Sequence, residues 1–173
     1  MQTWPQPAAS QPIPMPPPVF PVSSPEAQPL AASGRKRILV ADASMIILKT
    51  LTMKLKASGY DVLTAQDGGT AVSIVRREKP DLILLDITFP PDVAHGGGVA
   101  WDGFLIMNWV RRMDEAKHIP IIIITGGDPA AYKNRSLAAG AAAFFHKPIN
   151  NDELLAAIRQ SLGQDSVPTA PPA

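Results

Sequence analysis

Four polar residues stand directly after short apolar runs of the sequence and could do chemistry together: Asp42, Asp86, Thr125 and Lys147. An unpaired carboxylate is costly to bury, so an acid that ends an apolar run needs hydrogen-bonding partners or a site that uses its charge. Two carboxylates about 4 Å apart repel by a few kcal/mol, and a divalent cation removes that repulsion. A lysine can neutralise a phosphoryl group, to which a threonine hydroxyl can also donate. These residue types therefore predict an anion site beside a metal ion.

The apolar runs themselves are typical of buried strands. They comprise residues 38–41, 62–65, 82–85, 121–124 and 142–145. Three are continuous aliphatic stretches of four, as expected for strands that are covered on both faces. The run at 62–65 is more mixed, which favours an edge strand.

Helical patterns alternate with these runs, and several have recognisable ends. Ser44 is a candidate cap for a helix that stops at Gly59, and a second helix ends before Pro80. Asp128 can cap a fourth helix that has Pro129 in its first position. The apolar stripes comprise Ile47, Leu51 and Leu55 in the first helix, Ala71, Ile74 and Val75 in the second, Phe104, Leu105, Trp109 and Met113 in the third, which begins near Asp102, and Leu154, Leu155, Ile158 and Leu162 in the last, which Gly163 closes. We interpret these stripes as core.

Five β–α repeats imply right-handed crossovers and a doubly wound α/β fold, with a five-stranded parallel sheet covered by helices on both faces. Parallel strands share one polarity, so the four polar residues should gather at one rim of the sheet. In such folds, ligands bind at the carboxyl ends of the strands, near the switch in strand order. A single acid at a strand end is more often a helix cap, but four polar groups at consistent positions favour a site.

Composition narrows the function classes. The chain has 173 residues, of which 46% are hydrophobic, and it has 16 basic against 15 acidic residues and no cysteine. The near-neutral charge gives no indication of a basic surface for nucleic acid. Because there is no cysteine, disulfides and thiolate metal sites are excluded. No signal sequence is recognisable, and no apolar window approaches the roughly 18 residues that cross a bilayer. We expect a cytoplasmic protein without nucleic-acid or membrane partners.

Prolines divide the chain. Ten of the 19 prolines lie in residues 1–34, which we expect to be a disordered proline-rich tail, and residues 164–173 show the same composition. Residues 35–163 are then the single folded domain. The stretch PMPPPVF has two interpretations: a docking peptide for an aromatic groove, or a solvated tether. We favour the tether because no basic anchor lies beside the prolines.

The ordered stretches ILVAD, PDLILLD followed by Pro90, IIIIT and AAAFFHKP resemble the receiver domain of bacterial response regulators in two-component systems. The resemblance covers roughly residues 36–163. It implies a flavodoxin-like fold with strand order 2-1-3-4-5. It also implies that Asp86 is the phosphoacceptor, which takes a phosphoryl group from the phosphohistidine of a sensor histidine kinase or a histidine phosphotransfer protein.

The same resemblance implies roles for other residues. Asp42, Asp86 and the backbone carbonyl of Thr88 would hold Mg²⁺, and Lys147 would neutralise phosphoryl oxygens. Thr125 would contact the phosphoryl group and draw its loop inward.

Phe144 stands at the family's aromatic switch position and would turn inward with the Thr125 loop. It lacks the hydroxyl of a tyrosine, so no phenolic hydrogen bond can hold it outward. The bond between Lys147 and Pro148 is expected to be cis.

The sequence departs from the family at two places. Ala43 stands where the family usually has a second acid, so we expect weakened Mg²⁺ affinity and possible loss of phosphotransfer. The segment between Asp86 and Gly103 is about nine residues longer than usual. Asp92, in this loop (89–101), is a candidate auxiliary metal ligand, and His95 a candidate ligand or supporting group. We favour the alternative that the loop shapes partner choice.

Two function hypotheses remain. The first is a stand-alone phosphoacceptor receiver with autophosphorylation and autodephosphorylation on Asp86 but no conventional substrate turnover. Only about ten residues follow the last helix, so we expect output by protein contact, through the face formed by the fourth helix, fifth strand and fifth helix. The second is a pseudo-receiver that acts as a phosphorylation-independent interaction module, as Ala43 suggests. An unrelated small-molecule-binding flavodoxin-like protein is disfavoured by the Asp, Thr and Lys set.

Overall fold

The computed structural model describes residues 34–88 and 102–164. Strands and helices alternate along this part of the chain. The strands are β1 (Arg37–Ala41), β2 (Asp61–Ala65), β3 (Leu82–Asp86), β4 (Ile121–Thr125) and β5 (Ala143–His146). The helices are α1 (Met45–Ala57), α2 (Gly68–Glu78), α3 (Gly103–Arg112), α4 (Pro129–Ala138) and α5 (Asn151–Ser161).

All five strands pair in parallel, in the order β2-β1-β3-β4-β5. The predicted fold class and strand order are therefore confirmed. Every residue of β3 and β4 is buried, whereas β5 is half-exposed, and the mixed strand β2 forms the other edge, as its sequence predicts. The fully aliphatic runs thus occupy the centre of the sheet, where both faces are covered.

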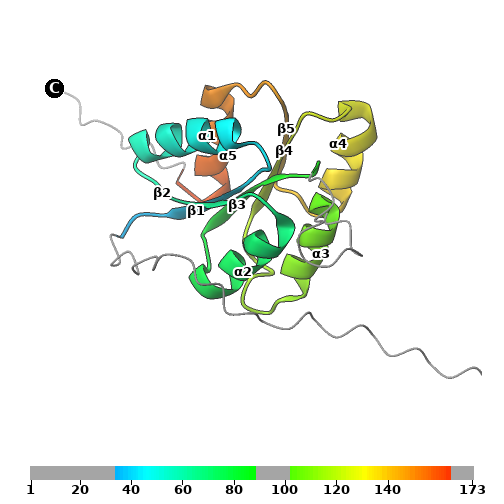
Figure 1. The fold of residues 1–173 in the computed structure, drawn as a ribbon, viewed down its shortest axis with the longest axis horizontal. Coiled ribbons are helices and arrows are strands. Elements are labelled where there is room, and N and C mark those ends of the chain that lie inside the picture. The colour runs from blue at the N-terminus through cyan, green and yellow to red at the C-terminus, as the bar shows by residue number, and fades with distance from the viewer. Residues whose placement is uncertain (1–33, 89–101, 165–173) are drawn as a thin grey trace, which may run out of the picture. The chain divides into compact units, whose positions relative to one another are not determined.

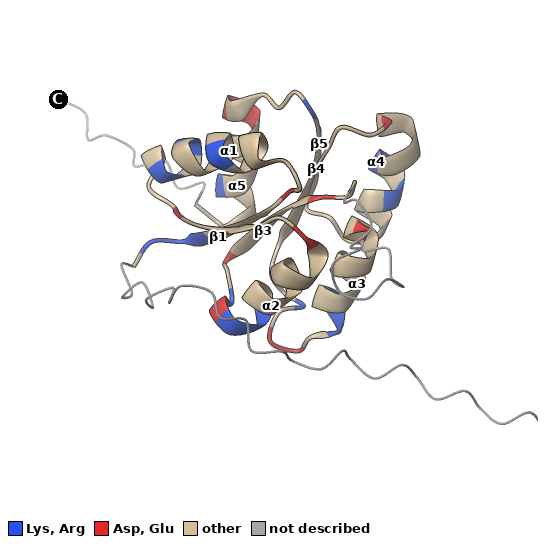
Figure 2. Ribbon diagram, in the orientation of Figure 1, with Lys and Arg blue, Asp and Glu red and all other residues tan. Residues whose placement is uncertain are grey.

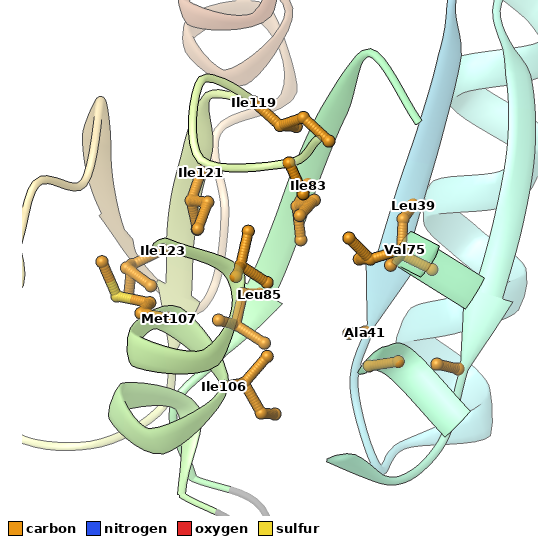
Figure 3. Packing of buried hydrophobic residues seen from close by; sticks show 14 of the residues in the cluster. Leu39, Ala41, Val75, Ile83, Leu85, Ile106, Met107, Ile119, Ile121 and Ile123 are labelled. Atoms are coloured by element: carbon orange, nitrogen blue, oxygen red, sulfur yellow. The ribbon is translucent and has the colours of Figure 1, made fainter. Parts of the chain in front are cut away.

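Helices α1 and α5 cover one face of the sheet, and α2 and α3 cover the other (Figure 1). Alternate residues of each strand point to opposite faces, so each central strand supplies both cores. Leu85 and Ile123 pack with Ile106 and Met107 of α3 in one core (Figure 3). Leu84 packs with α1 and α5 in the other. This double burial fixes the central strands, whose carboxyl ends carry the site.

Two helices begin at predicted acids whose side chains make the capping bond. Asp102 accepts a hydrogen bond from Leu105 N at 2.7 Å, and Asp128 accepts one from Ala130 N at 2.9 Å, with Pro129 in the first turn. Ser44 is an exception: it occupies the cap position of α1, but its side chain makes no capping hydrogen bond.

The buried face of α1 also differs from the prediction. Leu51 and Leu55 are in the core, but Leu48 is buried beside them and Ile47 is only half-buried. Gly59 ends this segment with φ +88°, a left-handed conformation that favours glycine.

Three features of the sequence lie outside the described residues: the proline-rich segment 1–33, the segment 165–173 and the loop 89–101 with Asp92 and His95. Their predicted roles stay predictions. Basic and acidic segments are scattered over the described elements (Figure 2). Among these elements, no helix has the length and apolar character needed to span a membrane.

Candidate functional site

Asp86 ends the central strand β3, and its residue is only 4% exposed. Its Oδ1 accepts two hydrogen bonds from Thr88, one from the backbone N–H at 2.8 Å and one from the hydroxyl at 2.7 Å. These bonds close a tight turn just after the strand. The carboxylate is therefore held in one orientation, with Oδ2 left for a different partner.

Asp42 follows β1, the neighbour of β3 in the sheet, and is 1% exposed. Its Oδ1 accepts a hydrogen bond from Ser44 N at 2.8 Å, and its own N–H donates to Ala65 O at 3.0 Å. The arrangement matches that of Asp86: each acid is fixed by the amide two residues later. Ala43, which stands between Asp42 and Ser44 in the sequence, is exposed at the rim.

Lys147 joins the two acids. Its Nζ donates to Asp42 Oδ2 at 2.5 Å and to Asp86 Oδ2 at 2.6 Å. Burial alone would lower the pKa of Lys147, but the hydrogen bonds and the charges of the two carboxylates outweigh burial and raise the pKa above its ordinary value. Lys147 is thus held as a cation. Two carboxylates and one ammonium leave one excess negative charge in the cluster.

Thr125 ends β4 and is fully buried. Its backbone carbonyl accepts from Lys147 N at 2.8 Å, which ties the ends of β4 and β5 together. Its hydroxyl oxygen accepts from Gly127 N at 3.1 Å. No hydrogen bond joins the Thr125 side chain to either acid within the described part of the chain.

Gly103 sets the distance between α3 and the end of β3. A Cβ at this position would lie 2.5 Å from Ile87 Cα and 2.7 Å from Asp86 O, too close for any side chain. Gly103 N also donates to Ile87 O at 3.2 Å. The first turn of α3 therefore lies directly against the backbone that carries Asp86.

The structure brings Asp42, Asp86 and Lys147 into direct contact, with Thr125 at the adjacent strand end. The sequence prediction did not include the Thr88 hydroxyl and the Ser44 amide as partners of the two acids. The pattern Asp-x-Thr or Asp-x-Ser after a strand would have indicated such turns, because these residues bond the backbone two positions on.

Phe144 is half-buried on β5 and packs against the same core as α3. The bond between Lys147 and Pro148 is cis, as the resemblance implies. Phe144 thus lies on the strand that Lys147 directly follows at the site.

The donor set fits a hard cation in part. Two buried carboxylates that share one ammonium are oxygen ligands of the kind that Mg²⁺ prefers, and their excess negative charge favours a cation. Over residues 34–88 and 102–164, however, no group of three or more His, Asp or Glu side chains is placed to hold a metal ion. The exposed Ala43 is the position that leaves the set one acid short.

Comparison with known proteins agrees with this geometry. The model of the response regulator receiver domain matches residues 38–159. The chain belongs to this family.

Individual relatives show the same relation. The chain is 36% identical over 123 residues to the response regulator PleD of Caulobacter vibrioides, a match that covers 71% of this chain and 25% of PleD. It is 33% identical over 126 residues to protein PilH of Pseudomonas aeruginosa, covering 73% of this chain and 97% of PilH.

Solved structures share the fold. A CheY-like receiver domain from Methanospirillum hungatei has a TM-score of 0.65 and 28% identity, covering 75% of this chain and 95% of that one. The chemotaxis protein CheY4 of Vibrio cholerae has a TM-score of 0.64 and 27% identity, covering 74% of this chain and 99% of CheY4.

Proposed function

We propose that Asp86 accepts a phosphoryl group from the phosphohistidine of a sensor histidine kinase or a histidine phosphotransfer protein. The observation that carries this proposal is the buried contact of Lys147 with both Asp42 and Asp86 at a strand rim. A partly buried cation held by two buried acids has little value for stability alone, because desolvation offsets the attraction. It is well suited to a site that must receive an anion.

The proposed reaction needs little covalent chemistry from the protein. An oxygen of Asp86 forms a bond to phosphorus while the bond between phosphorus and the partner's imidazole nitrogen breaks, and the imidazole keeps the electron pair. Because Oδ1 is bonded twice by Thr88, we assign the attack to Oδ2. Lys147 then transfers its hydrogen bond from Oδ2 to a phosphoryl oxygen, and the Thr125 hydroxyl donates to another. Positioning and charge neutralisation supply the catalysis.

Asp42, Asp86 and the backbone carbonyl of Thr88 would hold Mg²⁺ in this site. When bound, the ion would neutralise the phosphoryl oxygens. With Ala43 in place of a second rim acid, we propose that this chain binds Mg²⁺ more weakly than receivers that carry both acids.

We further propose that the phosphorylated protein signals through α4, β5 and α5. The packing of this region supports the assignment: Ser136 is the only buried residue of α4, and β5 is half-exposed. Thr125 and Phe144 connect this face to the site, since β4 pairs with β5 and Phe144 packs on the adjacent core. Loosely packed elements are the ones that move at low cost. The match covers 97% of PilH, so that relative consists of little more than this domain.

A pseudo-receiver is the second candidate, and Ala43 is the observation that favours it. On this alternative, the fold serves as a protein-interaction module and Asp86 is never phosphorylated. Lys147 would then only compensate the charges of the two buried acids.

Incubation of the full chain with acetyl phosphate and Mg²⁺ separates the two candidates. We expect intact-protein mass spectrometry to show an increment of about 80 Da, the mass of one phosphoryl group. The increment should be absent in Asp86→Asn. Asp114→Asn is the matched control, because Asp114 is an exposed acid whose partner is Lys117 and it should keep the increment.

The pseudo-receiver is the correct description if the wild-type chain stays unmodified at saturating Mg²⁺ while a receiver with both rim acids is modified in parallel. An increment that persists in Asp86→Asn would place the acceptor on another residue.

A further inference from the structure

The ring of Tyr132 lies on Gly127, in the turn between β4 and α4. A Cβ on Gly127 would lie 2.6 Å from Tyr132 Cε2 and 3.0 Å from Cδ2, so only glycine permits this contact. Tyr132 occupies the fourth position of α4, and Gly127 precedes the capping residue Asp128. At these two positions a pair of apolar side chains commonly packs and fixes the angle at which the chain enters a helix. Here, one ring packs against bare backbone and fulfils that role.

The turn that Tyr132 covers also holds the Thr125 hydroxyl. Thr125 Oγ1 lies 3.4 Å from the same Cβ point of Gly127, and it accepts a hydrogen bond from Gly127 N at 3.1 Å. A hydroxyl has one donor and two acceptor sites. Because Gly127 uses an acceptor site, the hydroxyl hydrogen stays available for another oxygen. The position of Gly127 therefore determines where Thr125 can donate.

A second contact of the Tyr132 ring is with Phe104, on the helix that packs against the backbone of Asp86. The ring centroids of Tyr132 and Phe104 are 6.3 Å apart, with an interplanar angle of 31°. Phe104 is buried on α3, next to Gly103, and the guanidinium carbon of Arg135 lies 3.8 Å from the centroid of the Phe104 ring. Tyr132 thus connects the turn of Thr125 with the helix that lies against the backbone of Asp86.

We propose that Tyr132 is a positioning residue for the phosphoryl site: its ring holds Gly127 in place and so directs the Thr125 hydroxyl toward the group transferred to Asp86. This inference rests on the proposed function. It adds an aromatic residue on α4 to the path between Thr125 and the surface, separate from Phe144 on β5.

The test compares rates of acetyl phosphate incorporation in the full chain with Mg²⁺. Tyr132→Leu should slow incorporation by about threefold or more, since misplacing a reacting group costs rate, and Tyr132→Phe should restore it because the ring is kept. Tyr60→Leu is the matched control: it removes a buried ring in the opposite core and should change the rate by less than about twofold. In a Thr125→Val background, Tyr132→Leu should have no further effect, because the hydroxyl it positions is gone.

An equal loss of rate in the Thr125→Val background would overturn the proposal, as would equal effects of Tyr132→Leu and Tyr60→Leu. A second measurement does not depend on phosphorylation. Hydrogen exchange of the Gly127 amide, followed by NMR, should accelerate in Tyr132→Leu and stay at the wild-type rate in Tyr132→Phe. Unchanged exchange in Tyr132→Leu refutes the positioning role, even if the wild-type chain accepts no phosphoryl group and the proposed function itself fails.

Discussion

The two ends of the sheet carry the same kinds of charge in opposite environments. At the amino ends of the strands, Lys36 pairs with Asp81 at 2.9 Å, with side-chain exposures of 46% and 31%. At the carboxyl ends, Lys147 contacts both acids at 2.5 and 2.6 Å, with its side chain 18% exposed and the acids nearly fully buried. The first pair is screened by water, whereas the second cluster has lost most of its hydration.

This difference in exposure distinguishes charge pairs that contribute weakly to stability from a charge cluster that is suited to binding. Exposed pairs contribute little and can be exchanged at small cost. A buried cluster with one excess negative charge is a poor way to stabilise a fold, because well-packed apolar residues would often do as well. Its presence at the rim where ligands bind in doubly wound folds therefore indicates a binding role.

The largest difference between the two ends of the sheet is expected when the cation is removed from each. Lys147→Met leaves Asp42 and Asp86 buried without their partner, so we expect a loss of about 3–5 kcal/mol in the free energy of unfolding. Lys36→Met at the other end should change it by about 1 kcal/mol or less. Urea denaturation at neutral pH without Mg²⁺ measures both. Equal losses in the two variants would contradict the contrast between the ends.

A smaller effect is expected when an acid is added at the carboxyl end of the sheet. Ala43→Asp should tighten Mg²⁺ binding by about tenfold, because affinity for a divalent cation rises with the charge of the ligand set. The exposed position makes the new carboxylate cheap to accommodate. Ala57→Asp adds the same charge at the far end of α1 and should leave the affinity unchanged. Isothermal titration calorimetry measures the Mg²⁺ affinity of the wild type and of both variants. Equal affinities in all three would mean that Ala43 does not limit metal binding.

The smallest effect is expected from acid titration at the amino end. Burial alone would raise the pKa of Asp81, but the hydrogen bonds from Lys36 and the Arg37 backbone, with the charges of both residues, lower it below the ordinary 3.8. The stability from Asp81 is therefore fully present above pH 3.8 and is lost as pH falls through the folded-state pKa.

Asp81→Asn should remove this contribution, about 1 kcal/mol or less, and flatten the decline in stability below about pH 4. Urea midpoints measured across the acid range test it. An identical acid decline in the variant and the wild type would show that Asp81 does not contribute.

Much of the fold could be predicted from the sequence because its central strands consist of uninterrupted aliphatic runs. Residues 82–85 and 121–124 are typical of strands covered on both faces, and parallel strands then bring Asp86 and Thr125 to one rim. The contact of Lys147 with both acids follows the same logic, since β5 ends at that rim.

The rest depends on packing between distant parts of the chain. Whether Ile47 or Leu48 of α1 is buried depends on how the helix rotates against the sheet, which the spacing of its apolar residues leaves open. Likewise, the contact of Tyr132 with Gly127 depends on the angle between α4 and β4. Neither the rotation of α1 against the sheet nor the angle between α4 and β4 can be predicted from local sequence patterns. The roles of Asp92 and the loop around it stay predictions, since they lie outside the described residues.

We propose that, within the cluster of Asp42, Asp86 and Lys147, Asp86 in particular receives the phosphoryl group. Borohydride reduction of the chain after reaction with acetyl phosphate and Mg²⁺ converts an aspartyl phosphate to homoserine, which peptide mass mapping locates. We predict homoserine at position 86 and an unchanged residue at position 42. Homoserine at position 42, or at neither position in a chain that carries the phosphoryl mass, would exclude Asp86 as the acceptor.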